Sequence, residues 1–265
     1  MSNKGYALVT GATGGLGKAF VYTLAEEGYS LILTGRSQRK LEELQREIQT
    51  QYNSLDVLYY PTDLAEEEGR ARLMNWVMDK KIPLTLLANV AGVDIQKGVE
   101  VNDQRKVRLQ CRVNFEAAVD LCRFAIQISG ERLEIVNVSS VSGIYPMPYF
   151  AIYSATKSAL TSFSVSLREE MKGKNVAVTV VLPGAMPTRP DICKQIQGQG
   201  IWGKLAVMDP KRVAEGSLRA VHRNRRKVII GFWNKAMRFF TCLLPTSWRL
   251  AFIAKRWSKI SKDAF

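Results

Sequence analysis

A tyrosine and a lysine in the second half of the chain have a spacing that suits acid–base chemistry. Tyr153 and Lys157 stand four residues apart at the start of a stretch with helical periodicity, so their side chains share one helix face. A phenol ordinarily ionises near pH 10, and a neighbouring ammonium lowers its pKa toward the range useful to a general acid or base. Alone the pair is a weak signal, because about 0.6 such pairs are expected by chance at this composition.

A glycine-rich turn near the N-terminus predicts a cofactor site. Residues 10–17 read TGATGGLG, directly after a predicted strand and before an apolar-periodic helix. Glycines let the backbone turn tightly and approach a pyrophosphate, while the helix N-terminus supplies N–H groups. The Lys-Ser/Thr pair of a triphosphate-binding loop is missing, so a dinucleotide is favoured over ATP. A purely structural turn is the alternative.

The end of the second predicted strand indicates which dinucleotide binds. An NAD site usually has a carboxylate here for the ribose 2′-hydroxyl. This chain instead has Gly35, Arg36 and Ser37, and a guanidinium can grip a 2′-phosphate with two hydrogen bonds. The sequence therefore predicts NADP(H), with a solvated surface arginine as the alternative. Ser37 is also a candidate helix N-cap.

These residues need elements to position them, and the chain alternates short apolar runs with helical stretches. This alternation is typical of βαβ units and a parallel sheet. No linker or internal repeat interrupts residues 4–231, so we expect one domain, 1–231, followed by an extension, 232–265. Seven strands are predicted, at 6–10, 30–34, 56–60, 84–89, 134–139, 177–182 and 227–230.

The motifs together resemble the single-domain short-chain dehydrogenases/reductases over residues 4–231. The residues that carry the resemblance are the 10–17 turn, Asn89-Val90-Ala91-Gly92, Asn114, Ser140, Tyr153, Lys157, and Pro183-Gly184 with Thr188. The resemblance implies an α/β fold of the Rossmann type: a doubly wound, seven-stranded, mainly parallel sheet with helices on both faces. Here a basic helical C-terminal extension is added. The family's serine lies about a dozen residues before its tyrosine, which selects Ser140 and leaves Ser139 a structural role.

The resemblance also implies the catalytic roles. Tyr153 would donate a proton to the forming alkoxide, and Ser140 would hydrogen-bond the carbonyl oxygen. Lys157 would bind the nicotinamide ribose and lower the pKa of Tyr153. Asn114 would hold a water that relays protons from Lys157; an amide that caps or kinks a buried helix is the alternative.

The same resemblance implies the cofactor contacts. Asp63 would meet the adenine, although a plain helix N-cap is an alternative that can hold at once. The family's motif here is Asn-Asn-Ala-Gly, and this chain has Val90 as its second member. Because Asn89, Ala91 and Gly92 remain, this difference puts the cofactor contact of the segment in little doubt. Residues 189–207 have the character of a substrate lid or of an ordinary surface loop. The cofactor-binding residues expected are Thr10, Gly11, Thr13, Gly15, Leu16, Gly17, Arg36, Ser37, Asp63, Leu64, Asn89, Ala91, Gly92, Tyr153, Lys157, Pro183, Gly184 and Thr188.

The segment between the serine and the tyrosine bears on the substrate. It is mostly apolar, which favours a large hydrophobic carbonyl compound or alcohol over a sugar, although core or dimer packing would look the same. The residues concerned are Val141, Ile144, Tyr145, Met147, Tyr149 and Phe150. With its extended tail the chain looks most like the branch with steroid and long-chain 3-oxoacyl reductases.

The C-terminal quarter carries most of the net positive charge. Residues 204–265 hold 15 Lys and Arg against three acidic residues, +12 of the formal +14. The longest uncharged run of the aromatic-rich tail, 239–248, is too short to span a bilayer. One helix face is predicted to collect Leu250, Ile253, Ala254, Trp257 and Ile260. This pattern fits an interfacial helix on an anionic membrane, and equally a helix over the substrate entrance or a partner subunit.

Composition limits the remaining classes. The single histidine argues against multi-histidine metal sites, so no metal is expected. The four cysteines lack C-x-x-C spacing and no secretory segment is evident, so we expect packing cysteines and a cytoplasmic protein, with peripheral membrane contact an option.

The prediction is an NADP(H)-dependent oxidoreductase, in a dimer or tetramer, that interconverts a hydrophobic ketone and a secondary alcohol. A 3-oxoacyl or steroid substrate is favoured, and a hydroxysteroid or bile-acid dehydrogenase is as defensible. The alternative from another functional class is a cofactor-binding, membrane-tethered module that has no catalytic activity. Nucleic-acid binding through the basic tail is a third class, and no specific nucleic acid is expected.

Overall fold

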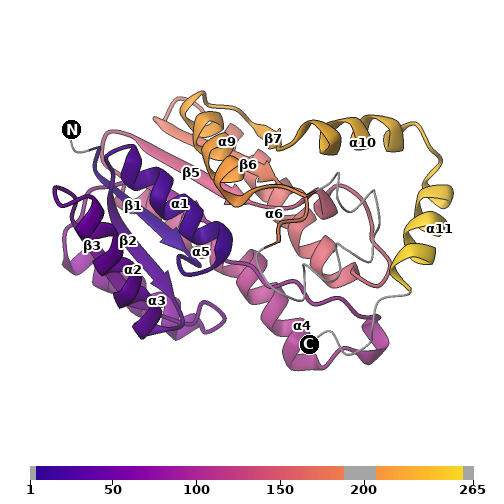
Figure 1. Ribbon diagram of the computed structural model, residues 1–265, viewed down its shortest axis with the longest axis horizontal. Coiled ribbons are helices and arrows are strands. Elements are labelled where there is room, and N and C mark those ends of the chain that lie inside the picture. Colours follow the sequence, from indigo (N-terminus) through magenta and orange to yellow (C-terminus); the bar gives the residue numbers. More distant parts are fainter. Residues whose placement is uncertain (1–3, 188–206, 259–265) are drawn as a thin grey trace.

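A seven-stranded sheet forms the centre of the computed structural model, which describes residues 4–187 and 207–258 (Figure 1). Every strand pairing in these ranges is parallel, and the strand order is β3-β2-β1-β4-β5-β6-β7. The expected doubly wound sheet is therefore confirmed. The strands are β1 (Tyr6–Thr10), β2 (Ser30–Gly35), β3 (Val57–Pro61), β4 (Leu84–Asn89), β5 (Leu133–Val138), β6 (Val176–Leu182) and β7 (Lys227–Ile229).

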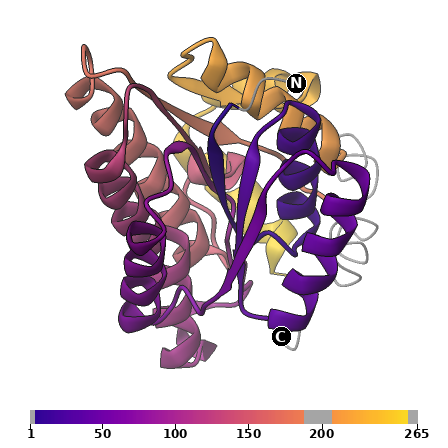
Figure 2. The same cartoon turned by 90° about the vertical axis from the view of Figure 1, so that its left-hand side faces the viewer.

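Helices cover both faces of this sheet (Figure 2). One face carries α1 (Gly15–Glu26), α2 (Gln38–Gln51) and α9 (Pro210–His222). The other face carries α3 (Glu67–Asp79), α5 (Ala117–Ile128) and α6 (Ala151–Glu170). Successive strand residues point to opposite faces, so Ala7 and Val9 join the first core whereas Leu8 joins the second.

The burial of both faces explains why the strands were readable from sequence. A strand covered on both sides is a nearly continuous apolar run, and these runs stand out between amphipathic helices. In β5, for example, all six residues are buried. Each predicted strand is present, and no strand end differs from its predicted position by more than one residue.

Shorter elements complete the described part of the chain. Two of them, α10 and α11, follow the last strand and form an arm that extends beyond the sheet (Figure 1). A π-helical segment, η2, separates α4 from α5. The shorter elements are η1 (Val99–Val101), α4 (Gln104–Cys111), η2 (Arg112–Glu116), η3 (Val141–Gly143), α10 (Phe232–Cys242) and α11 (Thr246–Trp257).

The strand order creates the crevice that holds the site. The chain runs from β1 outward through β2 to β3, and then returns to the other side of β1 with β4. The loops that leave β1 and β4 therefore diverge at the carboxyl edge of the sheet. In open α/β sheets ligands bind at this switch point.

The one histidine has a structural environment at the opposite end of the strands. His222, at the end of α9, hydrogen-bonds Glu134 of β5 through Nδ1 at 2.6 Å and Glu27 through Nε2 at 2.8 Å. These two carboxylate hydrogen bonds raise the pKa of His222 to about 9, against the opposing effect of burial. The imidazolium thus joins α9, β5 and the end of α1.

The cysteine expectation is correct for one of the two described thiols. Cys122 is buried in the α5 layer, where burial raises its pKa to about 12. Cys111 is exposed at the end of α4, so its assignment as a packing residue was wrong; an isolated cysteine gives no signal of which helix face it will occupy. Within residues 4–187 and 207–258, no helix has the length and apolar character needed to cross a membrane.

Candidate active site

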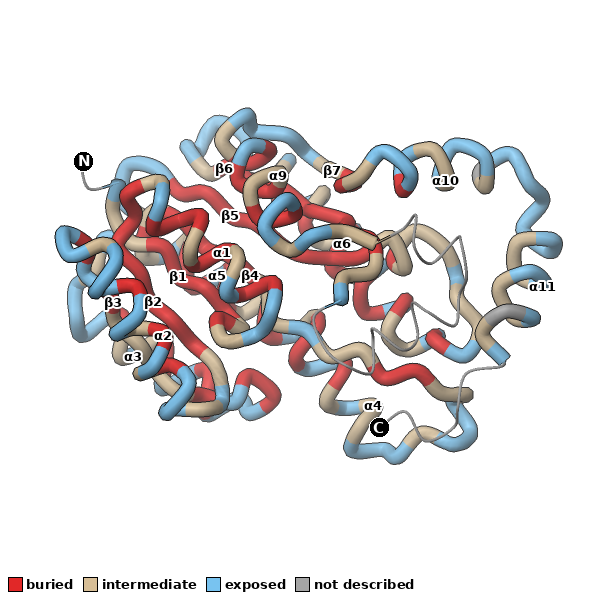
Figure 3. The backbone as a smooth tube through the Cα atoms, in the orientation of Figure 1, coloured by how far each residue is buried: buried red, intermediate tan, exposed pale blue. Residues whose placement is uncertain are grey.

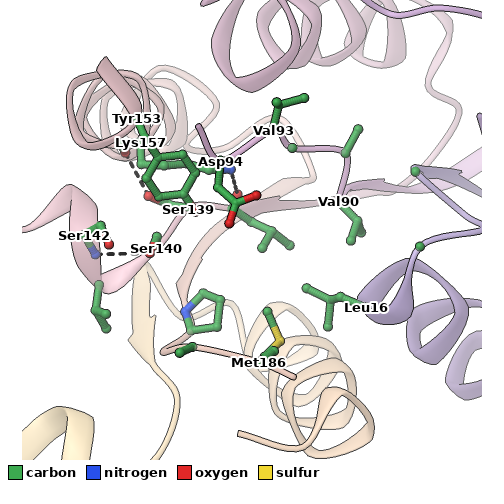
Figure 4. A pocket seen from close by; sticks show the side chains of 18 of the residues that line it. Leu16, Val90, Val93, Asp94, Ser139, Ser140, Ser142, Tyr153, Lys157 and Met186 are labelled. Carbon is green, nitrogen blue, oxygen red and sulfur yellow. Dashed lines mark hydrogen bonds between the residues drawn. The ribbon is translucent and has the colours of Figure 1, made fainter. Parts of the chain in front are cut away.

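A cleft of about 790 Å³ lies along the carboxyl edge of the sheet. It begins at the glycine turn between β1 and α1, passes the loops after β4 and β5, and ends at residues of α10 and α11. Figure 4 shows its central part, from Leu16 to Tyr153. Ser140, Tyr153 and Lys157, which sequence reasoning placed together, line one part of the cleft. Gly11, Thr13, Gly15, Leu16 and Gly17 line another.

The glycine turn is shaped by close backbone contacts. Gly11 has a φ of +64°, and a Cβ on Gly17 would lie 1.9 Å from the carbonyl oxygen of Gly11. Only glycine fits at both positions, because a side chain would collide with the backbone or strain it. No side chain caps the α1 N-terminus at Gly14. Its N–H groups can therefore serve an anion.

Thr10 supports this turn without lining the cleft. Its Oγ1 accepts hydrogen bonds from the backbone N–H groups of Val90 at 2.9 Å and Ala91 at 3.0 Å. The side chain is 1% exposed. Thr10 thus ties the loop after β4, including Ala91 and Gly92, to the glycine turn instead of reaching the cleft as expected.

The end of the cleft beside β2 is basic. Arg36 lines it and is exposed, as the sequence predicted. Lys40, in the first turn of α2, lines it too and was missed; its place three residues after the N-cap was the available signal. Ser37 does not line the cleft, because its Oγ accepts from the N–H of Lys40 at 3.4 Å and caps α2.

Asp63 and Leu64 line the cleft after β3, whereas Asn89 does not. Asp63 Oδ1 accepts from the N–H of Ala65 at 2.9 Å in the turn before α3, whose N-cap is Glu66, so the alternative of a helix N-cap was wrong for Asp63. Asn89 lies in the core, where its amide donates to Asn137 Oδ1 at 2.9 Å. It joins β4 to β5, a positioning contact and not the expected cofactor contact.

The two serines after β5 have different surroundings. Ser139 also lines the cleft, but its Oγ donates to the carbonyl oxygen of Lys157 at 2.8 Å and contacts Thr161 Oγ1, which fits the structural role expected of it. Ser140 lines the cleft, and its Oγ accepts from the N–H of Ser142 at 3.1 Å (Figure 4). With its acceptor side engaged in this turn, the Ser140 hydroxyl retains a proton to donate into the cleft.

Lys157 is a buried cation under Tyr153. Its side chain is 3% exposed, its Nζ donates to the carbonyl oxygen of Val138 at 2.8 Å, and Nζ lies 5.8 Å from the Tyr153 ring centroid. Burial lowers the Lys157 pKa to about 8, partly offset by the charge of Asp94. Asp94 points into the cleft beside Tyr153 (Figure 4) and was missed, because a lone acid in a loop carries no pattern.

Asn114 lies in the π-helical segment η2, behind the cleft wall. Its Oδ1 accepts from the N–H of Val93 at 2.7 Å, and its Nδ2 donates to the Val93 carbonyl at 2.8 Å and to Thr156 Oγ1 at 3.1 Å. The side-chain amide is thus bonded to protein groups. These contacts join the loop after β4 to α6, between Tyr153 and Lys157.

The substrate part of the cleft has apolar walls. Five of the six residues named from sequence line it: Val141, Ile144, Tyr145, Met147 and Phe150. The sixth, Tyr149, is 41% exposed and does not line it. Phe150 stacks on Tyr153 with centroids 4.4 Å apart, and on its other side Trp257 of α11 stacks at 5.5 Å.

The C-terminal helices form the far wall. Asn234, Met237 and Thr241 of α10 line the cleft, as do Ile253 and Trp257 of α11. Sequence reasoning left this covering role open, and the structure confirms it for these residues. Pro183 and Gly184, two of the expected cofactor contacts, line the cleft. Thr188 and residues 189–206 of the expected lid lie outside the described residues.

Fold and site together define a dinucleotide-fold oxidoreductase with a serine–tyrosine–lysine centre. The chain matches the short chain dehydrogenase family over residues 5–195, and it belongs to that family. The very-long-chain 3-oxoacyl-CoA reductase of Candida albicans is 26% identical over 253 residues, which cover 89% of this chain and 70% of the relative.

Two solved structures share the fold. A 7beta-hydroxysteroid dehydrogenase is 21% identical with a TM-score of 0.81, over 94% of this chain and 96% of that one. The L-sorbose reductase of Gluconobacter frateurii, in a complex with NADPH and L-sorbose, is 22% identical with a TM-score of 0.78, over 86% and 95%. At these identities the likeness concerns the fold.

Proposed function

We propose that the protein is an NADP(H)-dependent oxidoreductase that interconverts a hydrophobic ketone and a secondary alcohol. The observation that carries the proposal is one continuous cleft in which Ser140, Tyr153 and Lys157 face apolar walls from the 141–150 segment and the C-terminal helices. A polar reaction centre inside a mostly apolar pocket suits a large apolar substrate with one reactive oxygen.

The cleft fits a dinucleotide with a 2′-phosphate. The close approach of Gly17 to Gly11 leaves backbone exposed to a pyrophosphate, and the α1 N-terminus faces the same space. Arg36 and Lys40 supply two cations where the adenine ribose would lie, and either can pair with a phosphate. The bound nicotinamide would supply or accept the hydride.

The protein's own groups would handle the proton and the developing charge. In carbonyl reduction Ser140 would donate a hydrogen bond to the substrate oxygen and keep its proton, while Tyr153 would transfer one proton to that oxygen as it becomes an alkoxide. Lys157 remains mostly protonated at neutral pH with a pKa of about 8, and its charge favours the phenolate that Tyr153 becomes. Asn114 positions the loop after β4 against α6 through its amide contacts with Val93 and Thr156. The water that it was expected to hold as a proton relay from Lys157 to solvent remains a prediction.

The substrate class rests on the apolar walls and on the relatives. A 3-oxoacyl thioester or a steroid ketone is the first choice, because the Candida albicans relative is a 3-oxoacyl-CoA reductase. A hydroxysteroid or bile-acid dehydrogenase is an equally defensible alternative, because the same apolar walls would suit its substrate. Domain limits of 1–231 and 232–265, a homo-oligomer, and a cytoplasmic protein with peripheral membrane contact complete the proposal.

A substrate panel tests the activity. NADPH oxidation is followed at 340 nm with steroid ketones, 3-oxoacyl thioesters and a sugar ketone. Tyr153→Phe should lower turnover by at least about 100-fold, as expected for loss of a general acid. Tyr52→Phe, a surface phenol near Gln51, is the matched control and should change nothing. Unchanged turnover in Tyr153→Phe would sink the mechanism, and no turnover with any substrate would favour the non-catalytic cofactor-binding module.

Cofactor choice is tested separately. Arg36→Ala should weaken NADPH binding by about tenfold and leave NADH binding intact, because it removes one charge-assisted contact to the 2′-phosphate. Arg39→Ala is the control, since Arg39 pairs with Glu43 at 3.0 Å on the exposed side of the same helix. An unchanged NADPH/NADH preference in Arg36→Ala would exclude the contact.

A further inference from the structure

We propose that the outer face of α10 and α11 docks on an anionic lipid bilayer and holds the far wall of the cleft against the membrane. The opposite sides of these two helices have opposite roles. One side closes the cleft, and the other presents large apolar side chains to solvent. In Figure 3 the arm formed by α10 and α11 is coloured mostly as exposed or intermediate.

The outer face is unusually apolar for an exposed surface. Eight of the twelve exposed large apolar residues among those described belong to this short segment, with exposures from 45% to 75%. They recur at the spacing of one helix side in α10 and continue across Pro245 into α11. The outer face comprises Phe232, Trp233, Phe239, Phe240, Leu243, Leu244, Trp248 and Phe252. Large exposed apolar patches mark interaction sites.

The inner side is anchored to the site and cannot rotate outward. Asn234 is 3% exposed, and its Nδ2 donates to the Ile230 carbonyl at 3.0 Å. Thr241 Oγ1 and Tyr145 Oη lie 2.6 Å apart, and Trp257 stacks on Phe150. These contacts fix which side of each helix faces solvent.

Of the alternatives left open for the apolar stripe of α11, the structure supports a helix over the substrate cleft. Ile253 and Trp257 line the cleft, and Leu250 and Ala254 on the same stripe are half-buried. Ile260 lies outside the described residues. Helical periodicity identifies an apolar stripe but cannot tell whether protein or lipid covers it. The candidate membrane surface is therefore a different set of side chains.

Charge indicates an anionic bilayer as the occupant. Residues 231–258 contain no Asp or Glu, and Lys235 and Lys255 are exposed on α10 and α11. Arg238 is exposed too, but it also lines the cleft. Aromatic residues bordered by Lys and Arg suit the headgroup region of an anionic membrane. A symmetric dimer through this face would set one cationic patch against its copy, with no acid in this segment to compensate.

Docking would give the cleft direct access to the bilayer. This part rests on the proposed function: a ketone dissolved in the membrane would pass between α10 and α11 to Tyr153 without crossing water. Membrane docking itself requires no catalysis, so an experiment can refute the docking without refuting the proposed oxidoreductase activity, and the reverse.

Co-sedimentation of the full chain with vesicles tests the docking. We expect binding to phosphatidylcholine vesicles that contain about one-third phosphatidylserine, weaker binding to phosphatidylcholine alone, and loss in high salt. The double variant Trp248→Ser/Phe252→Ser should reduce the apparent vesicle affinity by at least about tenfold. Met78→Ser, which removes an exposed apolar residue from α3, should not.

The results distinguish a bilayer from a second subunit as the partner of this face, and they test the docking separately from the catalytic activity. Equal pelleting of the double variant and the wild type overturns the docking, as does no pelleting with anionic vesicles. If the double variant instead dissociates a dimer in light scattering without vesicles, the face is a subunit interface and docking is wrong. Unchanged thermal unfolding shows that the variant folds. Turnover of a short, water-soluble ketone reports the catalytic proposal alone and should be the same in both proteins.

Discussion

Lys157 should lower the stability of the cofactor-free protein, in a way that depends on pH. The group has a pKa of about 8 in the folded chain against an ordinary value of 10.5, because its ammonium is buried. A difference of about 2.5 between the two values corresponds to about 3 kcal/mol of destabilisation where both states are protonated. The unfolded chain binds the extra proton between these pKa values, so the penalty is full below pH 8 and is relieved as pH rises toward 10.5.

Lys157→Met removes this penalty and leaves the Val138 carbonyl without its donor, at a cost of about 1–3 kcal/mol. The net difference at pH 7 should therefore be between about 0 and 2 kcal/mol in favour of the variant. Its pH dependence is the sharper quantity. The free energy of unfolding of the variant, minus that of the wild type, should fall by about 2.5 kcal/mol between pH 7 and pH 10.

Urea unfolding followed by circular dichroism, without added nucleotide, measures this difference at each pH. Lys172→Met, a substitution of an exposed lysine just after the same helix, is the control and should leave the unfolding free energy at pH 7 nearly unchanged. Turnover of Lys157→Met should be lost, so stability and activity change in opposite directions. A flat difference for Lys157→Met across pH 7 to 10 would refute the assignment of a strongly desolvated cation.

Three other perturbations follow from contacts in the fold. His222→Gln should lower the free energy of unfolding by about 1–2 kcal/mol. The rise of the His222 pKa from 6.5 to about 9 corresponds to at most about 3 kcal/mol, and solvent screens this partly exposed group. In the same urea assay the full difference should be seen below pH 6.5, and it should vanish above pH 9. Gly143→Ala should destabilise by about 1–3 kcal/mol and lower turnover, because its Cβ would lie 2.8 Å from the Lys157 backbone carbon, whereas Gly130→Ala, with nothing within 4 Å, should be neutral in both assays. Arg70→Met should lower the unfolding free energy by about 3 kcal/mol, since this buried guanidinium binds two carboxylates and a backbone carbonyl; a change below about 0.5 kcal/mol in urea unfolding would show those contacts to be dispensable.

Much of the reaction centre could be predicted because its signals are local. Tyr153 and Lys157 share a helix face by the helical period alone, and both line the cleft. The glycine turn is readable because a strand, a tight turn and a helix must follow one another directly, and the spacing to the tyrosine separated Ser140 from Ser139. Strand positions were accurate because doubly buried strands are continuous apolar runs.

Other parts of the site depend on contacts between distant residues. Asn89, Thr10 and Asn114 carry family motifs, yet their side chains bond to protein groups behind the cleft wall. Asp94 and Lys40 reach the cleft through loop and helix geometry that no short pattern encodes.

The basic C-terminal segment shows most clearly which properties the sequence predicts and which ones the tertiary structure decides. The sequence by itself indicated a basic, amphipathic helical extension over residues 232–265, because periodicity and composition are properties of a single segment. Only the tertiary structure decided that Trp257 turns inward onto Phe150 while Trp248 and Phe252 remain exposed. The physical reason is that an apolar side chain gains the same free energy from any apolar cover, so orientation depends on which partner the rest of the fold brings within reach.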